Sequence, residues 1–122
     1  MNRYSCEETI VRQDKNLDDA LENIDIGGPT LLRAAAKNFP SVVVVVDPRD
    51  YVWVAQRLAD QTLTHEDRRT LAAKAFQHVA FYDTIVTNYL MEHSSNSLFS
   101  DEVTFAYRKL GNLRYGENPH QT

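Results

Sequence analysis

Residues 22–38 read ENIDIGGPTLLRAAAKN, and this stretch predicts a turn followed by a helix. Gly27 and Gly28 allow backbone angles and close approaches that a side chain would block. Pro29 suits the first turn of a helix because its missing N–H removes no internal hydrogen bond. We therefore expect a helix from Pro29 to about Asn38, with first N–H groups free to face a ligand oxygen or a phosphate.

This helix carries two cations, Arg33 and Lys37. Because they are four residues apart, they share one helix face. Spacing alone favours a surface helix with solvated cations, and a ligand-binding helix is the alternative.

A shorter helix is expected before this turn. Asn16 is a suitable N-cap, and apolar residues recur at the spacing of one helical face. These residues are Leu17, Ala20, Leu21 and Ile24. The pattern predicts a helix from Leu17 to about Ile24.

The clearest strand signal is SVVVVV at residues 41–46. Five consecutive valines indicate burial on both faces, as in the middle of a parallel sheet. The backbone groups of such a strand need neighbours on both sides, and residues 1–100 contain no second strand signal. Either another chain supplies the sheet, or the valines form an exposed edge prone to aggregation.

Two more helices are expected downstream. A turn at 47–50 leads into a helix over about 51–60, and a longer helix follows over about 65–92. Thr64 and Asp67 have the spacing of a capping box at the start of the longer helix. Its apolar stripe comprises Leu71, Ala75, Val79, Tyr82, Val86 and Leu90, widened by Ala72, Phe76 and Ala80.

Polar residues 94–97 follow the long helix and favour a domain boundary there. Beyond them, Val103, Phe105 and Tyr107 alternate with more polar residues, which is a period-two strand signal. Within the long helix, we interpret His78 as structural, since no second histidine or carboxylate recurs at metal-ligand spacing.

The composition limits the class of protein. The 122 residues are 43% apolar, which suffices for one domain with a core. A formal charge of −4 argues against a general nucleic-acid binder, although a nucleotide phosphate needs only a few local cations. The single cysteine, Cys6, suits a reducing cytosol, and no apolar run approaches the roughly 20 residues that cross a bilayer. The N-terminus also lacks a secretory pattern, so we expect a soluble cytoplasmic protein without a membrane partner.

Four motifs, in order along nearly the whole chain, together resemble one family. They are the stretch 22–38, VVVVVDPRDY at 42–51, LAAKAFQHVAFYD at 71–83 and LRYGENPHQ at 113–121. The chain resembles the bifunctional purine biosynthesis enzymes that join an IMP cyclohydrolase to an AICAR formyltransferase.

The resemblance implies an α/β fold. The chain would be a helix-rich fragment of a three-layer parallel-sheet domain, with a buried strand at 41–46, a long helix over about 65–92 and an extended C-terminal segment. Residues 1–93 would be the C-terminal half of the IMP cyclohydrolase domain, 94–102 a linker, and 103–122 the beginning of the AICAR formyltransferase domain.

The resemblance also assigns roles to residues around the glycine turn. Asp25 would contact the carboxamide of the substrate, and Lys37 would donate and accept protons. Ile26 and Gly27 would make backbone contacts, and Tyr4 would support or orient the formyl oxygen.

Three further residues are implied as substrate-binding. Asn2 would line the cyclohydrolase pocket, while Arg114 and Tyr115 would hold the ribonucleotide phosphate in the transformylase half. No metal and no cofactor bound by this segment are implied, and 10-formyltetrahydrofolate is the co-substrate of the full family enzyme.

Ring closure between an amide nitrogen and a formyl group needs proton transfer and support for a developing oxyanion. Lys37 lies about 12 Å along the helix from Pro29, although its side chain leans back toward the helix start. It would therefore meet only a ligand that lies along the helix. The alternative interpretation is that Asp25 is a turn or cap acid and Lys37 a solvated helix end.

The resemblance implies IMP biosynthesis, by cyclisation of the formylated AICAR ribonucleotide with loss of water. In the family, this step is fused to formyl transfer from 10-formyltetrahydrofolate to AICAR. The implied ligands are purine ribonucleotides (formylated AICAR, IMP and AICAR), and the full family protein would be a homodimer. The family's phosphate-binding loop and another active-site lysine have no counterpart here, so we predict that the isolated chain is inactive. The alternative is a non-catalytic truncated product or a helical interaction module.

Overall fold

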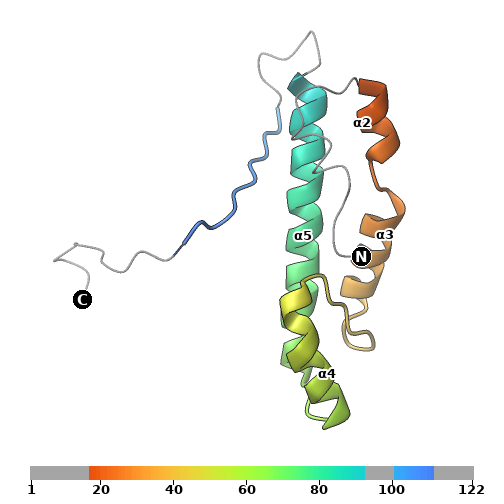
Figure 1. The fold of residues 1–122 in the computed structure, drawn as a ribbon, viewed down its shortest axis with the longest axis vertical. Coiled ribbons are helices and arrows are strands. Elements are labelled where there is room, and N and C mark those ends of the chain that lie inside the picture. Colours follow the sequence, from red (N-terminus) through yellow and green to blue (C-terminus); the bar gives the residue numbers. More distant parts are fainter. Residues whose placement is uncertain (1–16, 93–100, 112–122) are drawn as a thin grey trace, which may run out of the picture.

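A computed structural model describes residues 17–92 and 101–111, and this part of the chain is helix-rich (Figure 1). The longest element is α5, and α3 packs along it (Figure 1). An ion pair between Arg57 and Asp67 links α4 to the start of α5. No helix within the described ranges combines the length and the apolar character that crossing a membrane requires. The helical elements are α2 (Leu17–Asn23), α3 (Gly27–Lys37), the 3-10 helix η1 (Pro48–Asp50), α4 (Tyr51–Ala59) and α5 (His65–Glu92).

The predicted capping box at the start of α5 is confirmed. The Thr64 hydroxyl oxygen accepts the Asp67 N–H at 3.1 Å, and the Thr64 N–H donates to the Asp67 carboxylate at 2.9 Å. Arg57, from the last turn of α4, donates to both Asp67 oxygens at 2.6 Å. Hydrogen bonds from the Thr64 N–H and hydroxyl and from Arg57 hold the pKa of Asp67 below its ordinary value. The Asp67 carboxylate therefore caps the start of α5 and holds the turn that connects α4 to α5.

Small side chains let α3 and α5 pack closely. Ala36 of α3 meets Ala72 and Ala75 of α5 in one buried cluster, together with Val44 from the chain that follows α3. Leu32 packs against this cluster and also against Tyr82, further along α5. The core is therefore a seam between two helices, closed at one side by the valine run.

The predicted stripe of α5 is largely confirmed. Its buried members are Leu71, Ala72, Ala75, Val79 and Tyr82, joined by Tyr89. Leu90, expected in the stripe, and Phe76 and Ala80, expected to widen it, are exposed.

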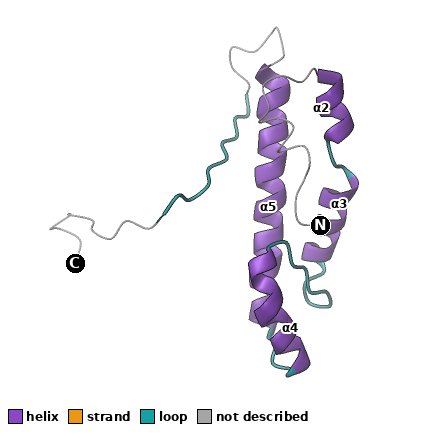
Figure 2. Cartoon of the chain, in the orientation of Figure 1, coloured by secondary structure: helices purple, strands orange, loops and turns teal. Residues whose placement is uncertain are grey.

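The strand expected at 41–46 is not formed. The chain over 42–47 has no helix or strand assignment, and only Val44 among the valines is fully buried (Figure 2). A strand needs a neighbour to complete its hydrogen bonds. Within the described residues, no hydrogen bond reaches the backbone of 43–46. The valines instead cover the α3–α5 seam from one side.

The period-two segment at 103–108 is likewise not a strand. Residues 103–111 carry no regular structure, and the Phe105 and Tyr107 side chains are exposed. The two rings stack at 6.3 Å between centroids. The described ranges are thus helical with irregular connections, and they do not confirm a parallel sheet.

A buried carboxylate joins η1 and α4 to α5. Asp50 is only 6% exposed, and it accepts hydrogen bonds from the Lys74 ammonium at 2.7 and 2.8 Å and from the Trp53 indole at 2.9 Å. Burial alone would raise the pKa of Asp50, but the hydrogen bonds from Lys74 and Trp53 outweigh it and keep the pKa below its ordinary value. The ionised carboxylate therefore stabilises the fold.

Replacing this carboxylate should weaken the fold in a pH-dependent way. We expect Asp50→Ala to lower the free energy of unfolding by about 2 kcal/mol at pH 7, because a charged hydrogen-bond acceptor is lost. Since the folded pKa is depressed, the contribution is present above about pH 4 and disappears as the pH falls through the folded pKa. Urea unfolding from pH 7 to pH 3 measures both effects. Asp60→Ala, at an exposed site, is the matched control, and an equal loss in that variant would contradict the assignment.

Enlarging a side chain in the α3–α5 seam should also destabilise the protein. Ala75 is fully buried, whereas Ala73 on the same helix is exposed. We expect Ala75→Leu to cost about 1–3 kcal/mol through overpacking. Ala73→Leu should change little, since leucine is nearly as good a helix former as alanine. Thermal unfolding of the two variants compares them, and equal midpoints would disprove the close seam.

Candidate functional site

The turn between α2 and α3 is organised by Asp25. One oxygen of its carboxylate accepts the Gly28 N–H at 2.9 Å, and its own N–H donates to the Tyr82 hydroxyl at 2.9 Å. Tyr82 comes from α5 and is 1% exposed, so the turn is tied directly to the core. These contacts fit the alternative interpretation of Asp25 as a turn or cap acid: it lies one residue before the N-cap, Ile26, and its half-buried carboxylate lies at the start of α3.

The helix begins earlier than expected, at Gly27 rather than Pro29. Pro29 is still tolerated because the first four N–H groups of a helix lack internal partners. A Cβ added at Gly27 would meet nothing within 4 Å, so the described residues do not require a glycine there. Ile26 is 72% exposed despite its apolar side chain. The turn thus presents an open surface beside the Asp25 carboxylate.

Lys37 lies at the opposite end of the same helix. It is the last residue of α3, and it is exposed. Its Cα lies ten residues after that of Gly27, which is about 15 Å along the helix axis. Arg33, one turn earlier, forms an ion pair with Asp83 of α5. The structure therefore arranges Asp25 and Lys37 along one helix, and their convergence on one ligand stays a prediction.

Four of the predicted site residues lie outside the described ranges: Asn2, Tyr4, Arg114 and Tyr115. Their roles stay predictions. Among the residues that the structure does describe, no group of three or more histidine, cysteine, aspartate or glutamate side chains could hold a metal ion.

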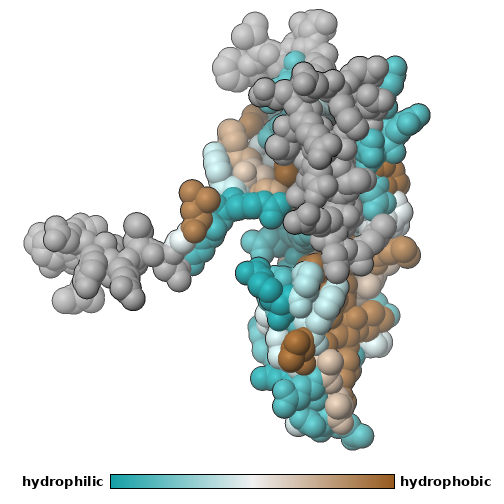
Figure 3. Space-filling view, in the orientation of Figure 1, coloured by the Kyte–Doolittle hydropathy of each residue, from teal (hydrophilic) through white to brown (hydrophobic). Residues whose placement is uncertain are grey.

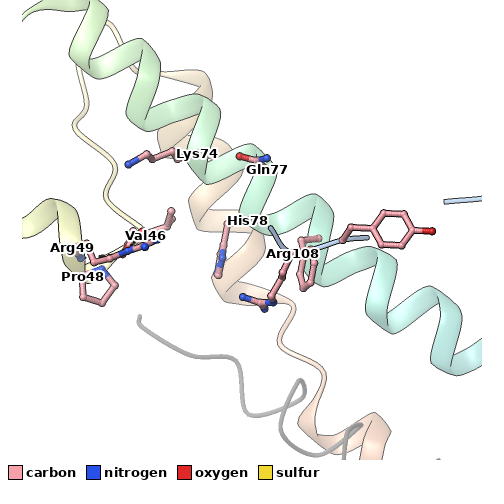
Figure 4. A pocket seen from close by; sticks show the side chains of 10 residues that line it. Val46, Pro48, Arg49, Lys74, Gln77, His78 and Arg108 are labelled. Carbon is pink, nitrogen blue, oxygen red and sulfur yellow. Dashed lines mark hydrogen bonds and ion pairs between the residues drawn. The ribbon is translucent and has the colours of Figure 1, made fainter. Parts of the chain in front are cut away.

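A separate hollow of about 450 Å³ lies where the loop after the valines, the middle of α5 and the C-terminal segment meet (Figure 4). We call it the cationic hollow. It includes neither Asp25 nor Lys37. Its lining residues are Val46, Asp47, Pro48, Arg49, Lys74, Gln77, His78, Phe81, Tyr107 and Arg108.

The charged groups of the cationic hollow are held by specific contacts. Asp47 caps η1 by accepting a hydrogen bond from the Arg49 N–H at 3.0 Å. Its carboxylate also accepts a hydrogen bond from the Arg49 guanidinium at 2.6 Å. The side-chain and backbone hydrogen bonds from Arg49 lower the pKa of Asp47 to about 2. The Arg108 guanidinium lies 4.3 Å from the centre of the Phe81 ring, a cation–π contact that fixes the C-terminal segment against α5.

Sequence reasoning missed this hollow. It interpreted His78 as structural and gave no role to Lys74, although the two lie four residues apart and share a face of α5. That spacing was the available signal. The approach of Arg49 and Arg108 to the same face depends on tertiary contacts that no local pattern encodes.

Comparison with known proteins identifies the family of the chain. The family model described as "AICARFT/IMPCHase bienzyme" matches residues 35–122. The chain is 48% identical over 122 residues to the bifunctional purine biosynthesis protein PurH of Thermoanaerobacter sp., covering 99% of this chain and 24% of that protein. The corresponding proteins of Leuconostoc mesenteroides and Lysinibacillus sphaericus are 49% identical over 121 residues and 51% identical over 122 residues, each covering 99% of this chain and 23% of the relative. The chain thus spans about a quarter of the length of the curated relatives that it matches.

Removing the Tyr82 hydroxyl should loosen the turn at the candidate site. We expect Tyr82→Phe to cost about 1 kcal/mol, because the Asp25 N–H loses its acceptor while the ring still fills the core. The Gly28 amide should also exchange its hydrogen faster, since the Asp25 carboxylate is then less well fixed. Chemical unfolding and hydrogen exchange measure the two effects. Tyr107→Phe, which removes an exposed hydroxyl, serves as the control, and unchanged exchange at Gly28 in Tyr82→Phe would refute the coupling.

Proposed function

Because this chain belongs to the AICARFT/IMPCHase bienzyme family, we propose that it carries part of the IMP cyclohydrolase site of such an enzyme. Residues 1–93 form the C-terminal half of the cyclohydrolase domain, 94–102 the linker, and 103–122 the beginning of the AICAR formyltransferase domain. The end of α5 at Glu92 and the irregular segment at 103–111 support these boundaries.

The observation that carries the proposal is the pair of hydrogen bonds at Asp25. Because Tyr82 and Gly28 fix the turn from both sides, the carboxylate is oriented before any substrate arrives. A second carboxylate oxygen beyond the bond to Gly28 leaves capacity to accept from a substrate amide. Ile26 and Gly27 contribute backbone contacts, and the open space at Gly27 supports a close approach of the substrate.

The reaction is ring closure of the formylated AICAR ribonucleotide to IMP. The carboxamide nitrogen bonds to the formyl carbon, and the formyl oxygen leaves as water with one proton from the amide and one from the formylamino group. Asp25 holds the carboxamide, and Lys37 supplies and removes protons during the closure. Because Lys37 lies about 15 Å from the turn along α3, the substrate extends along the helix.

Four further residues contact the substrates of the two activities. Tyr4 supports the formyl oxygen, and Asn2 lines the same pocket. Arg114 and Tyr115 hold a ribonucleotide phosphate in the transformylase half, where an arginine fork suits that group. There, 10-formyltetrahydrofolate donates the formyl group to AICAR. The complete protein is a soluble cytoplasmic homodimer, and this segment binds no cofactor of its own.

The unpaired valine run supports a parallel sheet in the complete protein. The backbone of 43–46 has hydrogen-bonding groups to offer, and exposed apolar side chains lie on α3 and α4, including Leu31 and Val52. Figure 3 shows apolar surface over the region of α4. Monomeric soluble proteins rarely expose large contiguous apolar patches. We infer that the rest of the family's length supplies strands on both sides of the valines and covers these helices.

A chimera tests the proposed catalytic residues. The matching quarter of the Thermoanaerobacter relative is replaced by this chain, and IMP formation from formylated AICAR is followed. We expect Lys37→Gln to reduce the rate by about 10²–10⁴-fold, the usual contribution of a positioned acid–base group. Asp25→Asn should reduce it as well, while both variants keep the unfolding midpoint of the parent chimera.

Arg33→Gln is the matched control, since it removes a cation from the same helix whose exposed ion pair contributes little stability. A rate for Lys37→Gln equal to that of the control would rule out the proton-transfer role. The 122-residue chain alone should form no IMP, and a measurable rate would overturn its assignment as an incomplete site.

A further inference from the structure

Thr30, in the first turn of α3, makes two hydrogen bonds to one carbonyl group of the candidate turn. Its hydroxyl donates to the Ile26 carbonyl oxygen at 2.8 Å, and its N–H donates to the same oxygen at 3.2 Å. A carbonyl oxygen has two lone pairs, so both are occupied here. This carbonyl therefore has no capacity left for a ligand, and a backbone contact from its peptide group must come from the N–H end.

The N–H end of that peptide group belongs to Gly27. The Ile26 carbonyl and the Gly27 N–H form one planar trans unit, in which they point in opposite directions. Because the carbonyl is held toward Thr30, the Gly27 N–H is directed out of the start of α3. Among the described residues this N–H has no hydrogen-bond acceptor, and a Cβ at Gly27 would meet nothing within 4 Å. The donor is therefore accessible to a ligand.

The orientation of this peptide group depends on more than the local backbone. Glycine adopts a wider range of backbone angles than any other residue, so a peptide group beside the Gly27–Gly28 pair can turn at little cost. The Asp25 carboxylate fixes the Gly28 N–H at 2.9 Å, but it makes no printed contact with the Gly27 N–H. The Thr30 hydroxyl adds a short second hydrogen bond to a carbonyl that otherwise has only a longer backbone one. It therefore restricts the rotation of the group.

We propose that Thr30 is a positioning residue for ring closure, an inference that rests on the function proposed above. Its hydroxyl orients the Gly27 N–H to donate to the carboxamide oxygen of the substrate, while the Asp25 carboxylate accepts from the carboxamide nitrogen. When a proton is drawn from that nitrogen, negative charge spreads onto the carboxamide oxygen, and a fixed N–H donor stabilises it. Thr30 acts through Gly27 and not on the substrate itself.

A threonine within a helix can make the same hydrogen bond without any functional role. Such hydroxyls bond to the carbonyl four residues earlier, at a slight cost to helix stability. Thr84 of α5 is an example in this chain, because its hydroxyl donates to the Ala80 carbonyl oxygen at 2.8 Å. The local contact is the same, but Thr84 lies inside a long helix and away from the candidate turn. Thr84→Val is therefore the matched control for Thr30→Val.

Rates of IMP formation by the chimera test the role of the hydroxyl. Thr30→Val keeps the shape of the side chain, and we expect kcat to fall about tenfold, less than the roughly 10²–10³-fold loss on removing an oxyanion donor outright. Thr30→Ala should lose as much, whereas Thr30→Ser, which keeps the hydroxyl, should stay within about twofold of the parent. Thr84→Val should keep the parent rate. Because Thr30 is exposed, its variants should keep the unfolding midpoint of the parent.

Nitrogen-15 relaxation of the 122-residue chain tests the same contact without measuring activity. A rigid backbone N–H has an order parameter of about 0.85, and a flexible one lies below about 0.6. We expect the order parameter of the Gly27 N–H to fall toward the flexible value in Thr30→Val. It should stay unchanged in Thr84→Val.

Three results would overturn the proposal. They are a kcat of Thr30→Val equal to that of Thr84→Val, a loss in Thr30→Ser as large as that in Thr30→Val, or an unchanged order parameter at Gly27 in Thr30→Val. Failure of the proposed function would look different, because Lys37→Gln and Asp25→Asn would then keep the parent rate. If those two variants lose activity and Thr30→Val does not, only the role of Thr30 is wrong.

Discussion

The hydrogen bond between the Tyr82 hydroxyl and the Asp25 N–H joins the hydrophobic core to the candidate catalytic turn. Tyr82 is among the largest fully buried side chains, so its hydroxyl is held by packing rather than by local backbone. A buried hydroxyl needs a hydrogen-bond partner, and the Asp25 N–H provides it. The same hydrogen bond holds the turn between α2 and α3 in place. The direction in which α3 starts, and therefore the line from Asp25 to Lys37, follows from it.

Helix α5, which carries Tyr82, also anchors other parts of the described chain. Lys74 of α5 holds the buried Asp50 at the start of α4, and Phe81 of α5 holds Arg108 of the C-terminal segment. These contacts come from different positions along α5, so the candidate turn and the cationic hollow are separate regions on one rigid element.

The uncovered surfaces are consistent with a chain that spans a quarter of its relatives' length. The valine run is half buried against the α3–α5 seam, and its backbone lacks a ladder within the described residues. Leu31 on α3 and Val52 on α4 are also exposed apolar side chains. Helices form with their own internal hydrogen bonds, whereas a strand requires a neighbour. That difference explains why the helices are present and the expected sheet is not.

The sequence by itself determined the helices, the capping box at Thr64 and most of the buried stripe of α5, because these depend on contacts within a few residues. It also determined the family through four ordered motifs. Only the tertiary structure decided that Tyr82 holds that turn and that a hollow joins three segments. Those contacts link residues 24 to 57 positions apart, as in the pairs Asp50–Lys74 and Asp25–Tyr82. No local pattern records which distant side chains will meet, since that depends on how the whole core packs.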